Sequence, residues 1–234
     1  KFISGIKNNV QIPLMGAVTV NWANETGAAT DGSAAFTKKT LSPKRITAKY
    51  PISLELLAQD TLDVESAVRE DIIKAVNAKL EETLLGSDLG DTSKPSGLFN
   101  GKTPDRIQSF GDLVALEAKV DDANVDGECK YVMSNKAKAD FRVMSKGTKS
   151  TQLVMEQGEI DGTQVLATSH VKDKNVIYGD FSNLVIATWD NITIDVVRDV
   201  ASVGNGNVTI VVNAFVDAAL IRDNALVYGT TAAE

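Results

Sequence analysis

The longest regular pattern of apolar and polar positions covers residues 63–85. This stretch contains no Pro or Gly, is rich in Ala, Leu, Glu, Lys and Val, and is followed by Gly86. Asp63 is a suitable N-cap, and Gly86 suits a left-handed residue after the last turn. The pattern therefore predicts a helix of about 23 residues, roughly 35 Å long.

The apolar positions of this helix form a row with a spacing of four residues: Val64, Val68, Ile72, Val76, Leu80 and Leu84. Such a row drifts by about 40° per step around a helix with 3.6 residues per turn. With Ile73 added to the second half, the two halves are predicted to face different directions. We therefore expect the first half to pack on one part of a sheet and the second half on another, toward a strand pair at 192–213.

Two alternating stretches flank the small-residue segment 27–35. The apolar members are Val18, Val20 and Trp22 before it, and Ile46, Ala48, Tyr50 and Ile52 after it. This pattern predicts a long two-stranded arm over 16–50, preceded by an extended segment at 1–15. A ribbon of two strands is only marginally stable in water. It therefore needs a surface, supplied either by its own domain or by a neighbouring subunit, and the pattern leaves both alternatives open.

The rest of the chain alternates short apolar runs with amphipathic stretches. Helices are predicted at 109–121 and 135–144, and a polar connection at 155–162. Short strands are predicted at 130–134, 165–171, 175–178 and 184–188. Two further strands, 192–196 and 208–212, flank the Asn-Gly pair of a hairpin. This order contains no regular strand–helix repeat, so the predicted fold class is α+β.

Composition and charge narrow the classes of function. The chain has 234 residues, 43% of them hydrophobic and 24% charged, which is typical of a soluble globular protein. A net charge of −7 argues against general nucleic-acid binding, which needs a basic surface. No apolar run approaches the ~20 residues of a membrane span.

Candidate chemistry is sparse. His170 and Cys129 are the only residues of their types, so a nucleophilic device or a zinc site has few possible members. An acidic group, Asp121, Asp122, Asp126 and Glu128, lacks the spacing of a calcium loop. No catalytic, cofactor-binding or metal site is predicted, and we expect the protein not to be an enzyme.

Basic residues gather on the returning side of the arm, at Lys38, Lys39, Lys44, Arg45 and Lys49. Lysines at a strand edge often serve only to keep the edge soluble. Because the chain is acidic overall, we favour the alternative that this charged arm docks on an acidic neighbour.

The order of these elements resembles the major capsid proteins of tailed bacteriophages, which have the Hong Kong 97 fold. The stretches that carry the resemblance are LSPKRITAKYPISLELL (41–57), ETLLGSD (82–88), KPSGLF (94–99), KYVMSNKAKADF (130–141), GTQVLATSHVKDKNVIYGDFSNLVIA (162–187) and NVTIVVNAFVDAALIRDNALVYG (207–229). Together they span nearly the whole chain.

The resemblance implies an α+β capsid fold with a long spine helix, an extended two-stranded arm, and peripheral and axial domains. It implies an N-terminal arm at 1–15 and an extension loop at 16–50 that lies on the neighbouring subunit. The peripheral domain takes 51–104, with the spine helix 63–85, and the strands of 186–216. The axial domain takes 105–185 and 217–234. The implied contact residues of the extension loop are Trp22, Phe36, Lys38, Lys39, Lys44 and Arg45.

The function implied is that of a major capsid protein that assembles into pentamers and hexamers of an icosahedral shell around double-stranded DNA. The implied partners are further copies of the chain, together with a phage protease, a portal and decoration proteins; no membrane is involved. Members are often made with an N-terminal segment that the protease removes, and a chain beginning at Lys1 is compatible with that. The shell would be assembled in the host cytoplasm. The alternatives are an encapsulin-type nanocompartment shell and a small α+β hydrolase that uses His170.

Some members of the family join an extension-loop Lys covalently to an Asn, with a Glu nearby. Aligning the last long strand places Asn213 at the position of the Glu and Gly206 at that of the Asn, with Lys38 or Lys39 as the amine. Because the Glu is replaced, we predict that this chain does not cross-link itself.

Overall fold

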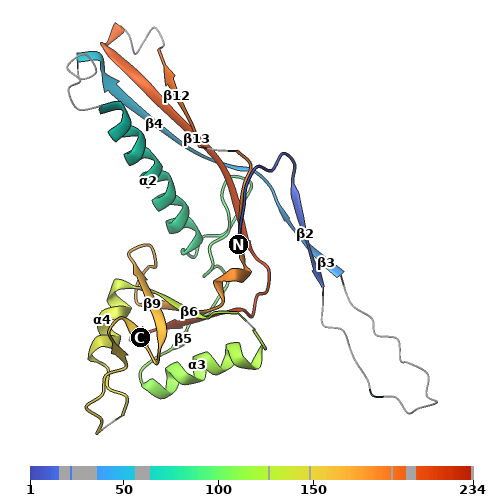
Figure 1. Ribbon diagram of the computed structural model, residues 1–234, viewed down its shortest axis with the longest axis vertical. Coiled ribbons are helices and arrows are strands. Elements are labelled where there is room, and N and C mark those ends of the chain that lie inside the picture. The colour runs from blue at the N-terminus through green and yellow to red at the C-terminus, as the bar shows by residue number, and fades with distance from the viewer. Residues whose placement is uncertain are drawn as a thin grey trace.

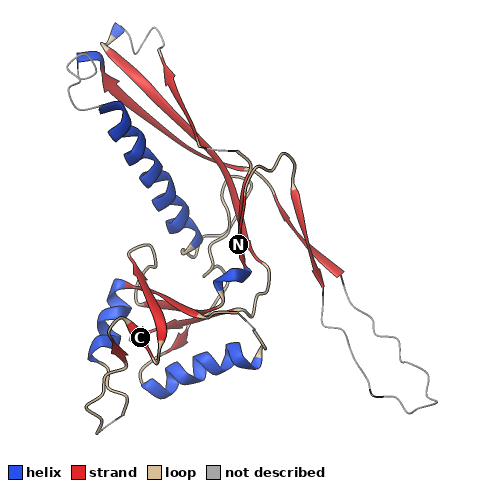
Figure 2. Cartoon of the chain, viewed as in Figure 1, coloured by secondary structure: helices blue, strands red, loops and turns tan. Residues whose placement is uncertain are grey.

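The computed structural model describes residues 1–15, 22, 36–55, 64–125, 127–147, 149–190, 192–198 and 204–232. The described chain forms two sheets, each with its own helices, and a two-stranded ribbon that leaves the body to one side (Figure 1). The long strands beside α2 lie at one end of the molecule, and α3 and α4 lie at the other (Figure 2).

The five-stranded sheet is built around its longest strand, β13 (Asn207–Leu220). One edge of β13 pairs with β4 (Lys44–Ser53), and its other edge pairs with β12 (Thr193–Val197) and β11 (Leu184–Thr188), all antiparallel. The short strand β1 (Phe2–Ile3) adds to β11 in parallel. Helix α2 (Val64–Leu84) packs on this sheet through one apolar cluster.

The seven-stranded sheet holds most of the remaining elements. Its strands, in spatial order, are β5 (Asp105–Arg106), β14 (Leu226–Thr230), β10 (Asn175–Gly179), β6 (Lys130–Ser134), β9 (Thr163–Thr168), β8 (Glu159–Ile160) and β7 (Met155–Glu156). Helices α3 (Phe110–Asp122) and α4 (Asn135–Val143) bury Leu113, Leu116, Val120, Ala137 and Phe141 in its core. A single turn of 3₁₀ helix, Phe181–Asn183, precedes the crossing to β11.

The ribbon consists of β2 (Val10–Met15) and β3 (Phe36–Leu41), which pair antiparallel from Val10 opposite Leu41 to Met15 opposite Phe36. It is a separate sheet of two strands, and it projects away from both larger sheets (Figure 1).

The helices agree with the patterns that predict them. Helix α2 begins at Val64 and ends at Leu84, within one residue of the predicted bounds at each end. Helix α3 begins after Ser109, whose side chain accepts from the Asp112 N–H while the Asp112 carboxylate accepts from the Ser109 N–H. This reciprocal capping box fixes where the helix starts.

The stretch 46–52, predicted as the returning strand of the arm, belongs to β4, which within the described residues pairs with β13. Alternating apolar positions fit any partner that buries one face, so the pattern does not identify the neighbouring strand. In the described part of the arm, the strands that pair are β2 and β3; Val18 and Val20 lie outside the described residues. The connection 155–162, predicted to be polar, contains the short hairpin of β7 and β8.

The prediction that α2 has two faces is wrong. Val68, Ile72, Val76 and Leu80 pack into one cluster on one face of the five-stranded sheet, while Ile73 is 38% exposed. A row of residues four apart winds slowly around its helix, and the strands beneath it twist. The drifting row therefore stays in contact with the twisted sheet along its length.

Only the last turn of α2 changes partner. Leu84 is buried outside that cluster, and its carbonyl accepts from the Leu98 N–H at 2.8 Å. Gly86 is not in the left-handed conformation predicted for it. A Cβ on Gly97 would lie 2.2 Å from the Gly86 carbonyl oxygen. Glycine at 97 thus lets the 94–101 loop lie directly against the end of the helix.

Candidate assembly surfaces

The base of the ribbon is anchored in an apolar cluster at the end of the five-stranded sheet. Leu41, at the last position of β3, is 1% exposed and packs with Val185 and Ala187 of β11. The N-terminal segment adds apolar side chains to the same cluster: Ile3, Ile6, Val10 and Ile12. The ribbon therefore leaves the body from a fixed, packed base.

Asp217 of β13 ties the turn between β3 and β4 to the sheet. Its carboxylate is almost fully buried and lies 2.9 Å from the Lys44 ammonium. It also accepts from the Ser42 N–H at 3.0 Å and from the Ala218 N–H at 2.9 Å. A buried charge that is paired and hydrogen-bonded fixes geometry, because any displacement leaves it unsatisfied.

A second tie lies further along the ribbon. The Lys39 ammonium donates to the Leu220 carbonyl at 2.5 Å and lies 2.8 Å from the Asp223 carboxylate. This pair is largely open to solvent, so it contributes less than the buried pair at Asp217. The direction of the ribbon is thus set by one buried tie and one exposed tie.

These ties correct the interpretation of the basic group. Lys39 and Lys44, predicted to dock on a neighbour, have acidic partners within their own chain. Lys38 donates to Gln11 across the ribbon at 3.4 Å. Arg45 and Lys49 are exposed on β4. The acidic residue of the buried pair, Asp217, was missed; the signal for it was a single Asp within the apolar strand 207–220.

The remaining predicted residues are two aromatic side chains of the arm and the apolar row on α2. Trp22 is fully exposed, whereas the side chain of Phe36 lies outside the description. Of the predicted packing row on α2, Val68, Ile72, Val76 and Leu80 come together on the sheet, and Leu84 is buried beside the 94–101 loop; the side chain of Val64 is not described.

An open groove lies between α2 and β4. Its volume is about 320 Å³, and its lining is mostly apolar, with one charged residue from each element: Ala48, Lys49, Tyr50, Val68, Asp71, Ile72 and Ala75. Within the described residues β4 pairs only with β13, so its outer edge is free beside this groove. A free strand edge next to an apolar groove is typical of a surface that another chain covers.

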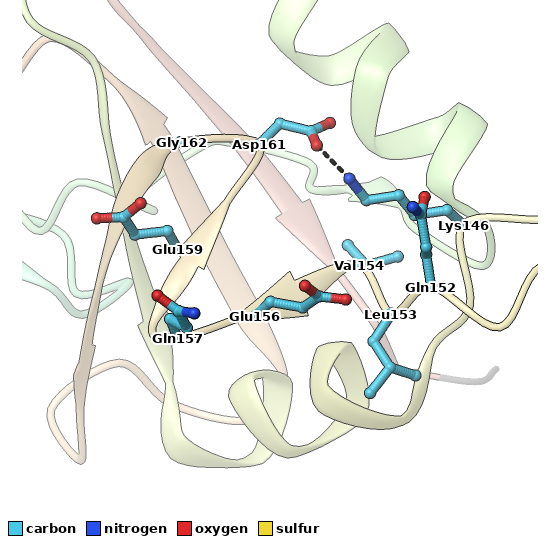
Figure 3. Close-up of a pocket in the computed structure, with 9 residues that line it drawn as sticks. All are labelled: Lys146, Gln152, Leu153, Val154, Glu156, Gln157, Glu159, Asp161 and Gly162. Atoms are coloured by element: carbon cyan, nitrogen blue, oxygen red, sulfur yellow. Dashed lines mark hydrogen bonds and ion pairs between the residues drawn. The ribbon is translucent and has the colours of Figure 1, made fainter.

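A polar pocket lies beside the β7–β8 hairpin (Figure 3). The Lys146 ammonium pairs with Asp161 there and lies 5.4 Å from the centre of the Phe110 ring. The side chains of Glu156 and Glu159 spread apart around the opening (Figure 3). The described lining residues include no Ser, Cys or His, so the pocket offers no nucleophile with a base beside it.

The remaining candidates for chemistry are His170, Cys129 and the acidic group at 121–128. His170 Nε2 lies 3.7 Å from a Glu81 carboxylate oxygen of α2, which ties the turn after β9 to the helix. Burial raises the pKa of the Cys129 thiol, which makes it less reactive than a free cysteine. Asp121 and Asp122 are exposed, and Asp126 lies outside the described residues. In the described part of the chain, no three His, Cys, Asp or Glu side chains converge as metal ligands.

A partly buried polar pair lies beside the seven-stranded sheet. The Tyr131 hydroxyl donates to Glu117 of α3. Burial is the main cause that raises the pKa of the Glu117 carboxyl, and the Tyr131 hydrogen bond opposes it. The pair joins α3 to β6 and has a structural role. Among the described helices, none combines the length and apolar character needed to cross a membrane.

Comparison with known proteins identifies the family. The model of the phage capsid family matches residues 4–231. The major capsid protein of Halomonas phage phiHAP-1 is 23% identical over 211 aligned residues, and the match covers 87% of this chain and 35% of that protein. The chain thus spans only about a third of the length of this curated relative.

Two solved structures illustrate the likeness in fold. The capsid of the native GTA particle, computed with C5 symmetry, has a TM-score of 0.79 at 17% identity, over 99% of this chain and 88% of that one. A chain of Microbacterium phage Oxtober96 has a TM-score of 0.77 at 13% identity, over 98% and 88%. The predicted α+β fold of Hong Kong 97 type is confirmed. Since the family model covers nearly the whole sequence, the chain belongs to the phage capsid family.

Proposed function

We propose that this chain is the shell-forming region of a major capsid protein from a tailed bacteriophage or prophage. Copies of it join as pentamers and hexamers of an icosahedral shell that encloses double-stranded DNA. The observation that supports this function best is the likeness to a solved capsid subunit along 99% of the chain. The described geometry adds a projecting ribbon and an open groove, which a lone subunit does not use.

The two sheets correspond to the two domains of such a subunit. The five-stranded sheet and α2 form the peripheral domain, and the seven-stranded sheet with α3 and α4 forms the axial domain, which lies around the five-fold and six-fold centres. Their apolar clusters are separate, as expected of two units that keep their own cores. The ribbon β2–β3 begins the extension loop.

The extension loop lies on the neighbouring subunit. Trp22 is fully exposed, and an indole side chain gains most from burial against a partner. Of the basic residues predicted to contact a neighbour, Lys38 and Arg45 remain available for acidic groups on that neighbour. Lys39 and Lys44 act instead on the ribbon of their own chain, since both are paired there.

The shell is part of the virion, and it is assembled in the cytoplasm of the bacterial host. Its further partners are a phage protease, a portal and decoration proteins. The subunit encloses the genome without reading its sequence, which suits a net charge of −7. This role is structural and requires no catalysis by the chain.

Electron microscopy of the purified protein tests this function. We expect capsomer rings or closed shells, and particles recovered from producing cells should contain double-stranded DNA. An encapsulin-type shell, the second candidate, has the same fold but would contain an enzyme as cargo. Shells that hold a protein cargo and no DNA would contradict the proposal.

Covalent cross-linking is not part of the proposed assembly. Asn213 occupies the position at which cross-linking members of the family carry a glutamate, and in this chain it lies within β13 between Thr193 and Thr47. Boiled, denatured particles should therefore run as a single monomer band on a gel. A ladder of multimers would show that the chain cross-links by other residues.

A further inference from the structure

Helices α3 and α4 divide one face of the seven-stranded sheet between them. Helix α3 packs over β14 and β10, whereas α4 packs over β6, β9 and β7. The chain leaves α3 at Asp122, begins β6 at Lys130 and enters α4 directly after that strand. The last turn of α3 and the helix α4 therefore lie on opposite sides of this part of the molecule (Figure 1).

These two places carry charges of opposite sign. Asp121 and Asp122 are exposed at the end of α3, and we call them the acidic end. Helix α4 carries the exposed Lys136 and Arg142 and the half-buried Lys138, and we call these three the basic face. Within the described residues, none of these five side chains forms an ion pair, although other pairs lie close by.

The helix dipoles make most of these charges unfavourable within a single subunit. Asp121 and Asp122 occupy the last turn of α3, where the partial negative charge of the helix repels a carboxylate. Lys136 and Lys138 occupy the first turn of α4, where the partial positive charge repels an ammonium. Charges that oppose their own helix and have no partner on it do not serve the stability of the subunit, which indicates a partner outside it.

Both helices also expose apolar surface next to these charges. Val143 is 78% exposed, and its spacing places it on the same side of α4 as Lys136 and the exposed Ala139. On α3, Val114 is 44% exposed and lies seven residues before Asp121, on the same side of that helix. Apolar side chains bordered by charges are typical of surfaces that another protein covers.

We propose that the basic face of one copy of this chain binds the acidic end of the next copy. The ammonium and guanidinium groups of α4 then pair with Asp121 and Asp122 of the neighbour, which relieves on each helix the charge that the subunit leaves unpaired. The contact is heterologous, because two different surfaces of the chain meet, and contacts of this kind close into rings when the rotation between copies allows it. The inference rests on the proposed function and deepens it, since it names side chains that join copies within a pentamer or hexamer.

The test uses two variants with reversed charges, D121K/D122K and K136E/K138E. Each variant presents like charges at both surfaces, so its self-association, measured by sedimentation velocity at low ionic strength, should be weaker than that of the parent by roughly tenfold or more. An equimolar mixture of the two variants should associate again, because each surface then meets its opposite charge. Both variants remain net negative, since the parent has a net charge of −7, so overall charge does not draw them together. Added salt should weaken the association of the mixture.

Folding gives a second readout that moves in the other direction. Each variant replaces charges that oppose a helix dipole with charges that suit it, so its urea midpoint should equal or exceed that of the parent. A matched control is E156K/E159K, which reverses two exposed charges on the β7–β8 hairpin and should self-associate as the parent does.

The proposal is overturned if the mixture associates no more than either variant alone, or if either variant self-associates as the parent does. It is also overturned if K136E/K138E forms normal particles that hold less DNA than those of the parent, because α4 would then contact the genome. The proposed function is judged separately, by electron microscopy of the parent. Association of the mixed variants without any shells from the parent would support this contact and reject the capsid function.

Discussion

At the scale of single residues, Asp217 of β13 anchors the base of the ribbon. It pairs with Lys44, whose side chain is only 14% exposed, and it holds the turn at Ser42. Replacing Asp217 with Ala leaves the largely buried Lys44 ammonium without its ion-pair partner. We expect a loss of about 3–5 kcal/mol in the free energy of unfolding, measured by urea denaturation.

The matched control for this variant is Asp223→Ala, which removes the acidic partner of Lys39 at the exposed tie. Its carboxylate is 69% exposed, so water replaces the lost contact. The expected loss is about 0–1 kcal/mol. Equal losses for the two variants would show that burial of the Asp217 pair has no special effect.

Glu117 gives a residue-scale prediction with a defined dependence on pH. Burial raises the pKa of its carboxyl in the folded protein above the ordinary value of 4.5. At pH values between the unfolded-state pKa and the folded-state pKa, the native state therefore holds a proton that the unfolded state has released. Stability contributed by this group is therefore lost as the pH rises through that window. Glu117→Gln removes this effect and keeps an oxygen that accepts from the Tyr131 hydroxyl.

The free energy of unfolding of Glu117→Gln, relative to that of the parent, should consequently be higher near pH 7 than near pH 4. Urea midpoints of both proteins at the two pH values measure this difference. Groups such as Asp112 and Asp140, whose pKa values are lowered, cancel in the comparison because both proteins carry them. If the two proteins differ in urea midpoint by the same amount at both pH values, the raised pKa of Glu117 is contradicted.

At the scale of elements, α2 and the twisted strands beneath it act as one unit. Adjacent residues of the helix test this directly, since Ile72 is 8% exposed in the cluster while Ile73 is 38% exposed. Ile72→Ala should cost about 2–5 kcal/mol of unfolding free energy, and Ile73→Ala less than about 1 kcal/mol, both by urea denaturation. Similar costs would restore the two-faced helix that the sequence pattern indicated.

The elements also show which parts of the fold are readable from sequence. Helix α2, helix α3 with its cap at Ser109, and strand β6 lie at or within one residue of their predicted bounds. Their determinants are local: periodicity, a capping side chain and a breaker residue all lie within a few positions. The pairing of β4 with β13 is not readable from the sequence, because it depends on residues more than 150 positions away.

The same limit explains what was missed at the assembly surfaces. Lys39 and Lys44 were recognised as a basic group, but their partners Asp223 and Asp217 lie 184 and 173 residues further along the chain. A free charge and a paired charge look alike in a sequence, so the group was assigned to a neighbour. The overall architecture is predictable from the resemblance to the capsid fold. The ion pairs Lys39–Asp223 and Lys44–Asp217 are visible only in the folded structure.

At the scale of the whole molecule, β13 is the member that connects the parts. It carries the α2 cluster along 210–216, Asp217 at the base of the ribbon, and Leu220, whose carbonyl accepts from the Lys39 ammonium. The base of the ribbon is therefore fixed to the same strand that carries the α2 cluster. In the proposed shell, this arrangement would hold the arm in a defined direction toward the neighbouring copy.

This arrangement predicts that the end of the arm matters for assembly and not for the folding of the subunit. Replacing residues 16–35 with an Asn-Gly turn keeps β2, β3, the Leu41 cluster and both ties. The free energy of unfolding should change by less than about 1 kcal/mol, because no described core contact is lost. Formation of shells, followed by light scattering and electron microscopy, should be abolished, because the surface that reaches the neighbouring copy is gone.

Asp217→Asn with an intact arm should instead lower stability and leave the arm present but poorly directed, so that irregular assemblies replace closed shells. Normal shells from the shortened arm would exclude the arm as the element that joins the subunits.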